Sequence, residues 1–219
     1  MDSRPTAIVY LDAFNFYKSQ LVQRPQNKWV NLEALFDRVL PSYRVVKIHY
    51  FAARVRGSAN PEDPKAPDRQ AVLIRALETL ERVETHLSHF SINAGRAREH
   101  VVDRSEPPST WLNVWKVQEK GSDVKLAVQL LLDALDKLAD IHVVVSGDSD
   151  LAEPIKVVIE RFKQRVGVLY PRNNQVGDFE SAGLTFSRFL HPADVAASQF
   201  PRTVVDGRQR QIVRPQEWK

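Results

Sequence analysis

The feature that most constrains the fold of this chain is a short apolar run that ends abruptly in two aspartates. Residues 141–150 read Ile-His-Val-Val-Val-Ser-Gly-Asp-Ser-Asp. The β-branched run His142–Val145 suits a strand buried on both faces of a parallel sheet, and residues 151–162 are expected to form the next helix. Ligands of such sheets gather where strands end and helices begin. Asp148 and Asp150 lie at that point, where two carboxylates repel each other unless a cation or a helix N-terminus neutralises them.

The rest of the chain alternates between predicted strands and predicted helices. Strands are expected at residues 7–11, 45–55, 86–92, 165–170 and 185–190, and helices at residues 31–40, 69–83 and 123–138. The proline-bearing segment 56–68 is expected to be a loop, and residues 93–121 an irregular stretch. Strands that alternate with helices imply right-handed crossovers. The order therefore predicts a three-layer α/β fold with a mainly parallel central sheet flanked by helices.

The composition excludes several classes of protein. The 219 residues include no cysteine, which rules out disulfides, zinc–thiolate sites and cysteine nucleophiles. We therefore expect a reducing or cysteine-indifferent compartment, and the cytoplasm fits best. No apolar run is long enough to span a bilayer and no signal peptide pattern is present, so no membrane partner is expected. The usual motifs of acyl transfer, P-loop nucleotide hydrolysis and dinucleotide redox chemistry are also missing.

The basic charge of the chain is concentrated at its C-terminus. The formal net charge is +4. Residues 201–219 hold five basic and two acidic side chains, which leaves the rest of the chain nearly balanced. A basic terminal arm can grip phosphates, and solvated disordered tails of this composition are also common. The charge is compatible with a nucleic-acid partner without requiring one.

Acidic residues from separate segments are expected to meet at one edge of the sheet. Asp12 follows the first predicted strand, Asp148 and Asp150 follow the central strand, and Asp123 opens a predicted helix. If the first and central strands are neighbours, their carboxyl ends bring these side chains together. Oxygen ligands without histidine or cysteine favour Mg²⁺ or Mn²⁺ over zinc. Such an ion can activate water and orient a phosphodiester, and Asn15 could hold a water or a substrate oxygen.

Each of these residues also has a simpler structural interpretation. A side chain within 148–150 could cap the following helix. Asp12 with Asn15 could form an Asx turn, and Asp123 could be a first-turn acid favoured by the helix dipole. Lys120, which could meet a phosphate, could equally be a solvated side chain. The joint occurrence of the acids favours the metal site, because a cap needs only one of them.

The stretch 93–121 offers cations and aromatic side chains directly before the acidic helix. The candidates are Arg96, Arg98, Arg104, Trp111, Trp115, Lys116 and Lys120. Nucleic-acid enzymes need cations for the backbone and often aromatics for base stacking, so we predict that this stretch forms one wall of a cleft. The alternative is that the two tryptophans form a hydrophobic patch under a long loop. No groove-reading motif is present, which favours single-stranded RNA over a duplex.

The histidines are not expected to bind metal. His86 and His89, three residues apart, could share one surface and bind an ion, but we expect them to be ordinary surface residues. His142 begins the central strand, far from its acidic end. We expect His142 to be structural.

Three sequence blocks resemble the signature blocks of the NYN domain family. They are Tyr-Leu-Asp-Ala-Phe-Asn-Phe at 10–16, Glu-Lys-Gly-Ser-Asp-Val-Lys-Leu-Ala-Val at 119–128 and Val-Ser-Gly-Asp-Ser-Asp-Leu at 145–151. The chain is similar to the bacterial LabA-like branch of this family, within the PIN-like nuclease superfamily. The resemblance covers about residues 6–190 as one nuclease domain and leaves 191–219 as a C-terminal extension with a basic tail that could be flexible.

The resemblance implies a PIN-like, Rossmann-like fold and a ribonuclease dependent on Mg²⁺ or Mn²⁺. The catalytic and metal-binding residues that it implies are Asp12, Asp123, Asp148 and Asp150. The substrate-binding residues that we assign with them are Asn15, Lys120, Ser146, Arg96, Arg98 and Trp115. The expected partner is RNA, single-stranded rather than duplex, and the chain could form a homodimer.

One departure from the family pattern concerns Gln129, where family members often carry a further aspartate. Helical geometry places Gln129 with Lys125 and Asp133 on a polar stripe, about 240° around the helix from Asp123, so the position could be peripheral. A missing carboxylate could also weaken a metal site. Two alternative functions therefore stay open. One is a module that binds RNA or protein without catalysis, and the other is a metal-dependent phosphatase that acts on a small substrate.

Overall fold

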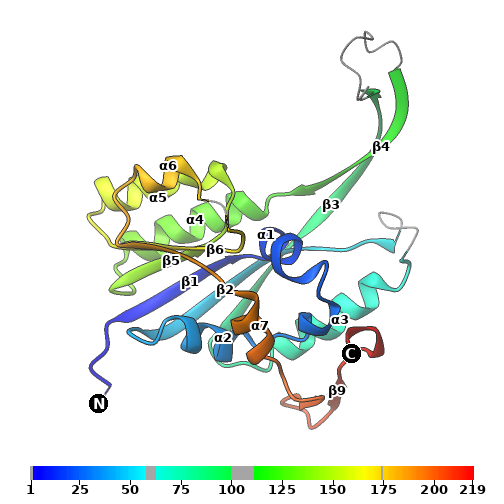
Figure 1. Cartoon of the computed structure of the whole chain (residues 1–219), viewed down its shortest axis with the longest axis horizontal. Helices are drawn as coiled ribbons and strands as arrows, with labels where there is room; N and C mark the ends of the chain where they lie inside the picture. Colours follow the sequence, from blue (N-terminus) through cyan, green and yellow to red (C-terminus); the bar gives the residue numbers. More distant parts are fainter. Residues whose placement is uncertain (1, 58–62, 100–110, 174) are drawn as a thin grey trace.

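A curled sheet of seven mostly parallel strands forms the centre of the structure, which is a computed structural model (Figure 1). The structure describes residues 2–57, 63–99, 111–173 and 175–219. The strand order is β4-β3-β2-β1-β5-β6-β7, and every neighbouring pair is parallel except β3 with β4. The strands are β1 Thr6–Asp12, β2 Arg44–Arg54, β3 Val83–Arg98, β4 Trp111–Lys120, β5 Ile141–Val145, β6 Val166–Tyr170 and β7 Phe186–Phe189.

Helices flank the sheet at nearly the predicted positions. They are α1 Ala13–Phe16, α2 Leu32–Val39, α3 Ala66–Leu77, α4 Ser122–Leu135, α5 Ala152–Glu160, α6 Gly177–Glu180 and α7 Pro192–Ala197, and a π-helical turn, Tyr17–Leu21, extends α1. Asn31 caps α2 as expected, because its side chain accepts a hydrogen bond from the backbone N–H of Ala34. The helix predicted at 69–83 begins three residues earlier, at Ala66, and ends at Leu77. Just after this end, the Thr79 hydroxyl donates a hydrogen bond to the backbone carbonyl oxygen of Ala76.

The central strands are buried on both faces, which explains their continuous apolar sequence. In β1, Ala7, Val9 and Leu11 pack with α2 and α3 in one hydrophobic cluster. Ile8 and Tyr10 point the other way and pack with α4 and α5 in a second cluster. This alternation with a period of two is the geometry of a strand between two sets of helices.

The pairing of β1 with β5 decides where the acids lie. The two strands are parallel, and Leu11 is in register with Val145. The next residues, Asp12 and Ser146, therefore leave the sheet side by side at its carboxyl edge. Both following segments turn at once into helix, β1 into α1 and β5 through the 3₁₀ turn Ser149–Leu151 into α5. The predicted neighbourhood of the first and central strands is confirmed.

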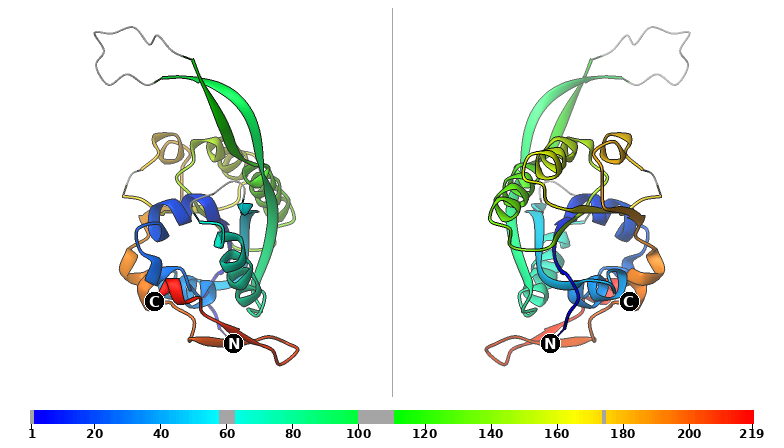
Figure 2. Two further views of the ribbon diagram at one scale, coloured as in Figure 1. Left: turned by 90° about the vertical axis from the view of Figure 1, so that its right-hand side faces the viewer. Right: turned by 90° about the vertical axis from the view of Figure 1, so that its left-hand side faces the viewer.

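The stretch 93–121 is not irregular as predicted, because most of its described part belongs to a long hairpin. β3 and β4 are antiparallel and pair from His89 with Lys120 to Arg98 with Trp111. The hairpin projects from the body of the molecule in every view (Figures 1 and 2). Because its outer half has no core to cover, its side chains lack the alternation of buried and exposed residues that identifies a strand in sequence. Pro107 and Pro108 lie outside the described residues.

The basic C-terminal tail is folded against the body. It contains the hairpin of β8 Thr203–Val205 and β9 Gln211–Val213, then the 3₁₀ turn Gln216–Trp218. Trp218 is buried, with its ring 6.3 Å from that of Trp29, and Ile212 joins the same hydrophobic cluster as β1. Of the two interpretations of the tail, the disordered one is wrong, because these apolar residues anchor it. In the described part of the chain, no helix is long and apolar enough to cross a membrane.

Candidate acidic site at the carboxyl edge of the sheet

Asp12 is the buried centre of the acidic edge. Its side chain is 5% exposed, and its two carboxylate oxygens accept hydrogen bonds from the backbone N–H of Asn15 at 2.9 Å and the Ser146 hydroxyl at 2.8 Å. Burial and the nearby charges of Glu119 and Asp148 raise its pKa, although the two hydrogen bonds oppose the shift. The Asx turn that sequence offered as an alternative is therefore present, and it fixes the carboxylate at the edge.

The turn after β5 is tied to Asp12 through two side chains. The backbone N–H of Asp148 donates to the Ser146 hydroxyl at 3.0 Å, and that hydroxyl donates to Asp12. The backbone N–H of Gly147 donates to the Asn15 side-chain oxygen at 3.2 Å. The side chains of Ser146 and Asn15 are therefore hydrogen-bonded to the backbone of the turn, and they hold Asp12 and Asp148 in position.

Asp148 also acts as a helix cap, as the alternative interpretation expected. One of its carboxylate oxygens accepts a hydrogen bond from the backbone N–H of Asp150 at 3.1 Å, at the start of the 3₁₀ turn. Its other oxygen is not used in this cap. Capping and metal binding are therefore compatible for Asp148.

Asp123 completes the group from the first turn of α4. It follows Gly121, whose φ of 85° permits the sharp entry from β4 into the helix. Partial removal from water, followed by the charges of Asp12, Asp148 and Asp150, raises its pKa to about 6. The structure thus brings the four predicted acids into one electrostatic neighbourhood.

A fifth acid, Glu119, joins this neighbourhood and was missed from sequence. It is half-buried near the end of β4, and both carboxylate oxygens are buried without a hydrogen-bond partner among the described residues. Burial raises its pKa and so does the charge of Asp123, while the neighbouring Ser122 hydroxyl opposes the shift. The only sequence signal was its place in the block 119–128, and the strand that aims it inward was not predicted. Lys120, which follows it, alternates to the opposite face of β4 and is exposed.

The donor set of this edge fits a hard divalent ion. All candidate ligands are carboxylate, hydroxyl or amide oxygens, which Mg²⁺ and Mn²⁺ prefer. The unpartnered Glu119 carboxylate is the kind of buried charge that a cation would neutralise. Within the described ranges, no three of these acids have oxygens that all lie within 4.8 Å of one another, so the edge is an open cluster.

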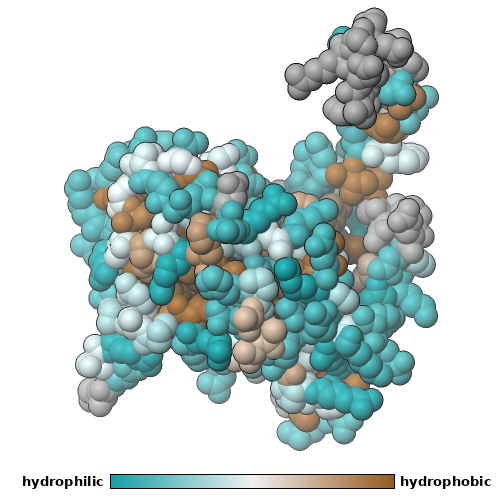
Figure 3. All heavy atoms as spheres, in the orientation of Figure 1, coloured by the Kyte–Doolittle hydropathy of each residue, from teal (hydrophilic) through white to brown (hydrophobic). Residues whose placement is uncertain are grey.

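The predicted substrate residues on the hairpin lie away from the acids. Arg96 and Arg98 place their guanidinium groups 5.7 and 5.4 Å from the ring centre of Trp111, and all three side chains are exposed. Trp115 is 74% exposed. The tryptophans therefore form neither a patch under a loop nor a wall beside the acids, because they lie on the projecting hairpin of β3 and β4. This hairpin bears scattered apolar surface (Figure 3). Arg104 lies outside the described residues.

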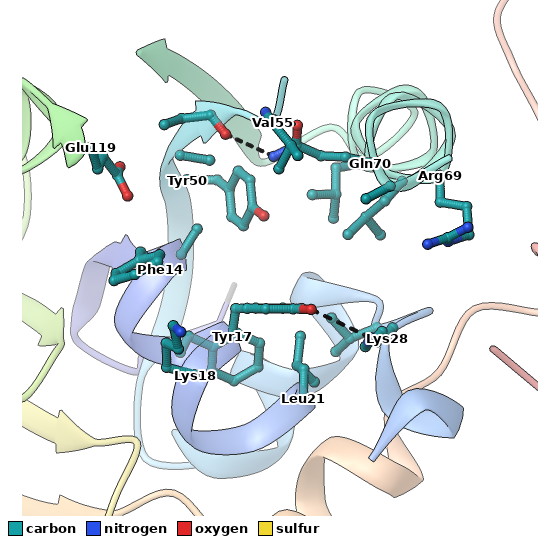
Figure 4. Close-up of a pocket in the computed structure, with 18 of the residues that line it drawn as sticks. Phe14, Tyr17, Lys18, Leu21, Lys28, Tyr50, Val55, Arg69, Gln70 and Glu119 are labelled. Carbon is teal, nitrogen blue, oxygen red and sulfur yellow. Dashed lines mark hydrogen bonds between the residues drawn. The ribbon is translucent and has the colours of Figure 1, made fainter. Parts of the chain in front are cut away.

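A cavity of about 340 Å³ lies beside the acidic edge, between α1, β2, α3 and the base of the hairpin (Figure 4). Phe14, Tyr17 and Tyr50 contribute aromatic surface, and the hydroxyl of Tyr17 lies 3.4 Å from the Lys28 ammonium nitrogen. Glu119 lines the cavity and so connects it to the acids. The other cations in its lining are Lys18 and Arg69, and Arg69 is paired with Asp63, which also lines the cavity. An aromatic cavity with a cationic rim suits a planar ligand that carries a negative charge.

Gln129 points away from the acidic edge. Its side-chain nitrogen donates to Asp133 at 2.7 Å, and the buried Asp133 also accepts hydrogen bonds from Tyr10 and His49. His142 is fully buried and pairs with the Tyr10 hydroxyl at 2.9 Å, which fits the structural role predicted for it. The peripheral interpretation of Gln129 is therefore the one that the structure supports.

Comparisons with known proteins give the family of the chain. The model of the NYN domain family matches residues 6–187. A curated relative, the 6-hydroxy-3-succinoylpyridine 3-monooxygenase HspA of Pseudomonas putida, is 29% identical, with an alignment that covers 100% of this chain and 77% of HspA. A crystal structure of a Vibrio parahaemolyticus protein of unknown function has a TM-score of 0.48 and 15% identity, and covers 87% of this chain and 96% of its own.

Proposed function

Because the chain belongs to the NYN domain family, a family of PIN-like nucleases, we propose that it is a ribonuclease that hydrolyses RNA phosphodiester bonds with Mg²⁺ or Mn²⁺. The single observation that carries this proposal is the gathering of Asp12, Asp123 and Asp148 at the carboxyl edge with an unpartnered Glu119. Like charges at such density cost free energy unless a cation occupies the site. We place the chain in the LabA-like branch on its three sequence blocks.

The residues of the acidic edge would have different roles in hydrolysis. A bound divalent ion would activate water and offset the charge of the phosphodiester. Asp12 is fixed by its hydrogen bonds to Asn15 and Ser146, so it offers a rigid ligand. Burial and the charges of the other acids raise the pKa of Asp123 to about 6, and a bound cation would relieve this cost and hold the carboxylate in its charged form as a ligand.

Single-stranded RNA is the substrate that the surface favours. The hairpin carries Arg96, Arg98, Trp111 and Trp115 on its exposed outer part. Cations that follow the backbone and aromatic rings that stack on bases are the usual means of binding single strands without a groove reader. The arm would then hold the strand while the acidic edge cuts it.

The test is cleavage of a fluorescent single-stranded RNA. We expect cleavage with Mn²⁺ that stops on chelation, and its loss in Asp148→Asn and in Glu119→Gln. Asp178→Asn, which removes an exposed acid from α6, is the matched control and should cleave normally. Cleavage that persists equally with chelator and in Asp148→Asn would overturn the proposal.

A second candidate function is action on a small aromatic carboxylic acid, and the cavity beside the acids favours it. The name of the HspA relative describes a substituted pyridine that carries a succinoyl group. Tyr17, Tyr50 and Phe14 offer stacking surface, while Lys18 and Lys28 could pair with a carboxylate.

Calorimetry with 6-hydroxy-3-succinoylpyridine tests this candidate. We expect binding that weakens about tenfold, or 1.4 kcal/mol, when Lys18 and Lys28 are both changed to alanine. Lys156→Ala, an exposed lysine on α5, is the control and should bind as the unaltered protein does. Absence of binding, or equal binding by both variants, would rule the cavity out as a site for this class of ligand.

A further inference from the structure

A second cluster of metal-ligating side chains lies on the face of the sheet that α4 covers. We propose that His49, Glu84 and His86 bind a transition ion of the Zn²⁺ or Fe²⁺ type, at a site distinct from the acidic edge. One ligand atom from each residue lies within 4.8 Å of the other two. The proposal rests on this geometry and is independent of the nuclease proposal.

The register of two parallel strands creates the cluster. His49 on β2 is paired with Glu84 on β3, and Phe51 is paired with His86. Because side chains alternate along a strand, residues two apart share a face, so all three ligands point to the same side. The sequence pattern predicts His86 at the surface without a third ligand. That expectation is wrong, because His86 is only 18% exposed, Glu84 lies two residues before it on the same strand, and the pairing of β2 with β3 brings His49 beside both.

A small separation of the two imidazole rings would admit one ion between the three side chains. Nδ1 of His49 lies 2.8 Å from Nε2 of His86, and the Glu84 carboxylate oxygens lie 3.8 and 3.7 Å from these two nitrogens. One ring donates a hydrogen bond to the other in this arrangement. An ion would take the place of the shared proton and use both nitrogens as lone-pair donors.

The ring of His49 is already held in the orientation that a metal ligand needs. Its Nε2 lies 3.1 Å from the Asp133 carboxylate, which itself accepts hydrogen bonds from Tyr10 and Gln129. A carboxylate that accepts from one ring nitrogen leaves the lone pair on the other nitrogen, here Nδ1, directed at the cluster. This carboxylate–histidine pair is the arrangement that commonly supports metal-bound histidines.

His86 is oriented by packing. Its ring is stacked on Phe51, with ring centres 4.5 Å apart and planes 16° apart. His49 is 1% exposed in its side chain, whereas Glu84 is 50% exposed, so the cluster opens to solvent on the glutamate side. An ion therefore has an entry path.

The ligand set determines the class of ion. Two imidazoles and one carboxylate favour Zn²⁺, Fe²⁺ or Co²⁺ over Mg²⁺, and three protein ligands leave a position for water or another ligand. The site is separate from the acidic edge, because Asp133 and Asp123 are ten residues apart on α4, about 15 Å along the helix.

Lys47 competes with the ion for Glu84. Its ammonium nitrogen lies 2.6 Å from a Glu84 oxygen, in a pair that is about half exposed. An exposed pair of this kind is weak, so it reduces the affinity for the ion without preventing binding. Removing the lysine should therefore tighten the site.

The experiment is a titration of the full chain with Co²⁺, in the Asp148→Asn background so that the acidic edge contributes little. We expect visible Co²⁺ bands typical of nitrogen ligation, displaced by Zn²⁺ and unaffected by Mg²⁺. His86→Gln and Glu84→Gln should weaken binding at least tenfold, and Lys47→Gln should strengthen it up to about fivefold. His89→Gln is the matched control, because His89 is exposed on the same strand.

Two results would overturn the proposal. One is the absence of the bands from the folded protein at a several-fold excess of Co²⁺. The other is binding that falls no further in His86→Gln than in His89→Gln. Circular dichroism confirms that each variant is folded, and RNA cleavage by the wild-type chain, whatever its outcome, leaves this test unaffected.

Discussion

Two buried aspartates, Asp12 at the end of β1 and Asp133 on α4, show how differently the same residue can be used. Asp12 is 5% exposed and Asp133 is 4% exposed. Burial alone would raise the pKa of Asp133, but hydrogen bonds from His49, Tyr10 and Gln129 outweigh it and lower the pKa. Asp12 has two donors and lies beside other acids, and its pKa is raised. The hydrogen bonds within the Asp133 network compensate its charge, whereas the charges of the acidic edge repel one another and would be balanced by a bound cation.

The strongest test of this difference is the activity of Asp148→Asn. The change preserves the shape of the turn and its capping oxygen but removes one charge from the edge. We expect RNA cleavage to fall at least about 100-fold, with the melting temperature unchanged or higher. Initial rates at saturating Mn²⁺ provide the measurement. A rate within a factor of three of the unaltered chain would contradict the role of the edge.

Asp133→Ala should affect stability instead. It leaves the buried donors of Tyr10 and His49 without their acceptor. We expect a loss of about 3 kcal/mol in the free energy of unfolding, which corresponds to a decrease of about 6–12 °C in melting temperature. Thermal denaturation followed by circular dichroism measures it. Asp136→Asn, an exposed acid at the end of the same helix, is the control.

The titration of Asp123 should give a smaller effect, a stability that changes with pH in a definite direction. Its pKa in the folded chain is about 6, above the ordinary value of 3.8. Between these values the folded chain holds a proton that the unfolded chain has lost, so without metal the stability contribution declines as pH rises through this window. Asp123→Asn should therefore raise the melting temperature by about 1–3 °C at pH 7 and by almost nothing at pH 4. An equal change at both pH values would contradict this account.

The smallest effect is expected at Gln129. An aspartate there would face Asp133 instead of the acidic edge, since Gln129 now donates to Asp133 at 2.7 Å. Gln129→Asp should therefore destabilise the chain by about 1 kcal/mol and leave the Mn²⁺ requirement of cleavage unchanged. Calorimetric titration with Mn²⁺ decides the point. A marked gain in Mn²⁺ affinity would place this position at the acidic edge after all.

Burial decides which parts of the fold and of the candidate site could be predicted from the sequence. The strand before Asp148 and the strand before Asp12 are apolar throughout because helices cover both faces, and such runs with acids at their ends are readable without a structure. The outer part of the β3–β4 hairpin covers no hydrophobic core, so its sequence lacks the alternation of apolar and polar residues that predicts a strand. Glu119 was missed with it, because only the strand shows that this side chain turns inward while Lys120 turns out.

The histidine cluster and the folded tail depend on long-range contacts. His49 and His86 meet only because β2 and β3 pair in one register, and a shift of one residue would separate them. Trp218 is anchored by Trp29, which lies far away in the sequence. Local patterns carry no information about either contact. The acids could be predicted because the ends of parallel strands meet at one edge whatever the exact register.

The central claim is that the acidic edge binds a divalent cation, and crystals soaked in Mn²⁺ test it most directly. We predict an anomalous scattering peak within about 2.2 Å of carboxylate oxygens of Asp12 and at least one of Asp123 and Asp148. The peak should disappear in Asp148→Asn or weaken strongly. An edge without any peak at saturating Mn²⁺, or a peak confined to His49, Glu84 and His86, would contradict the claim.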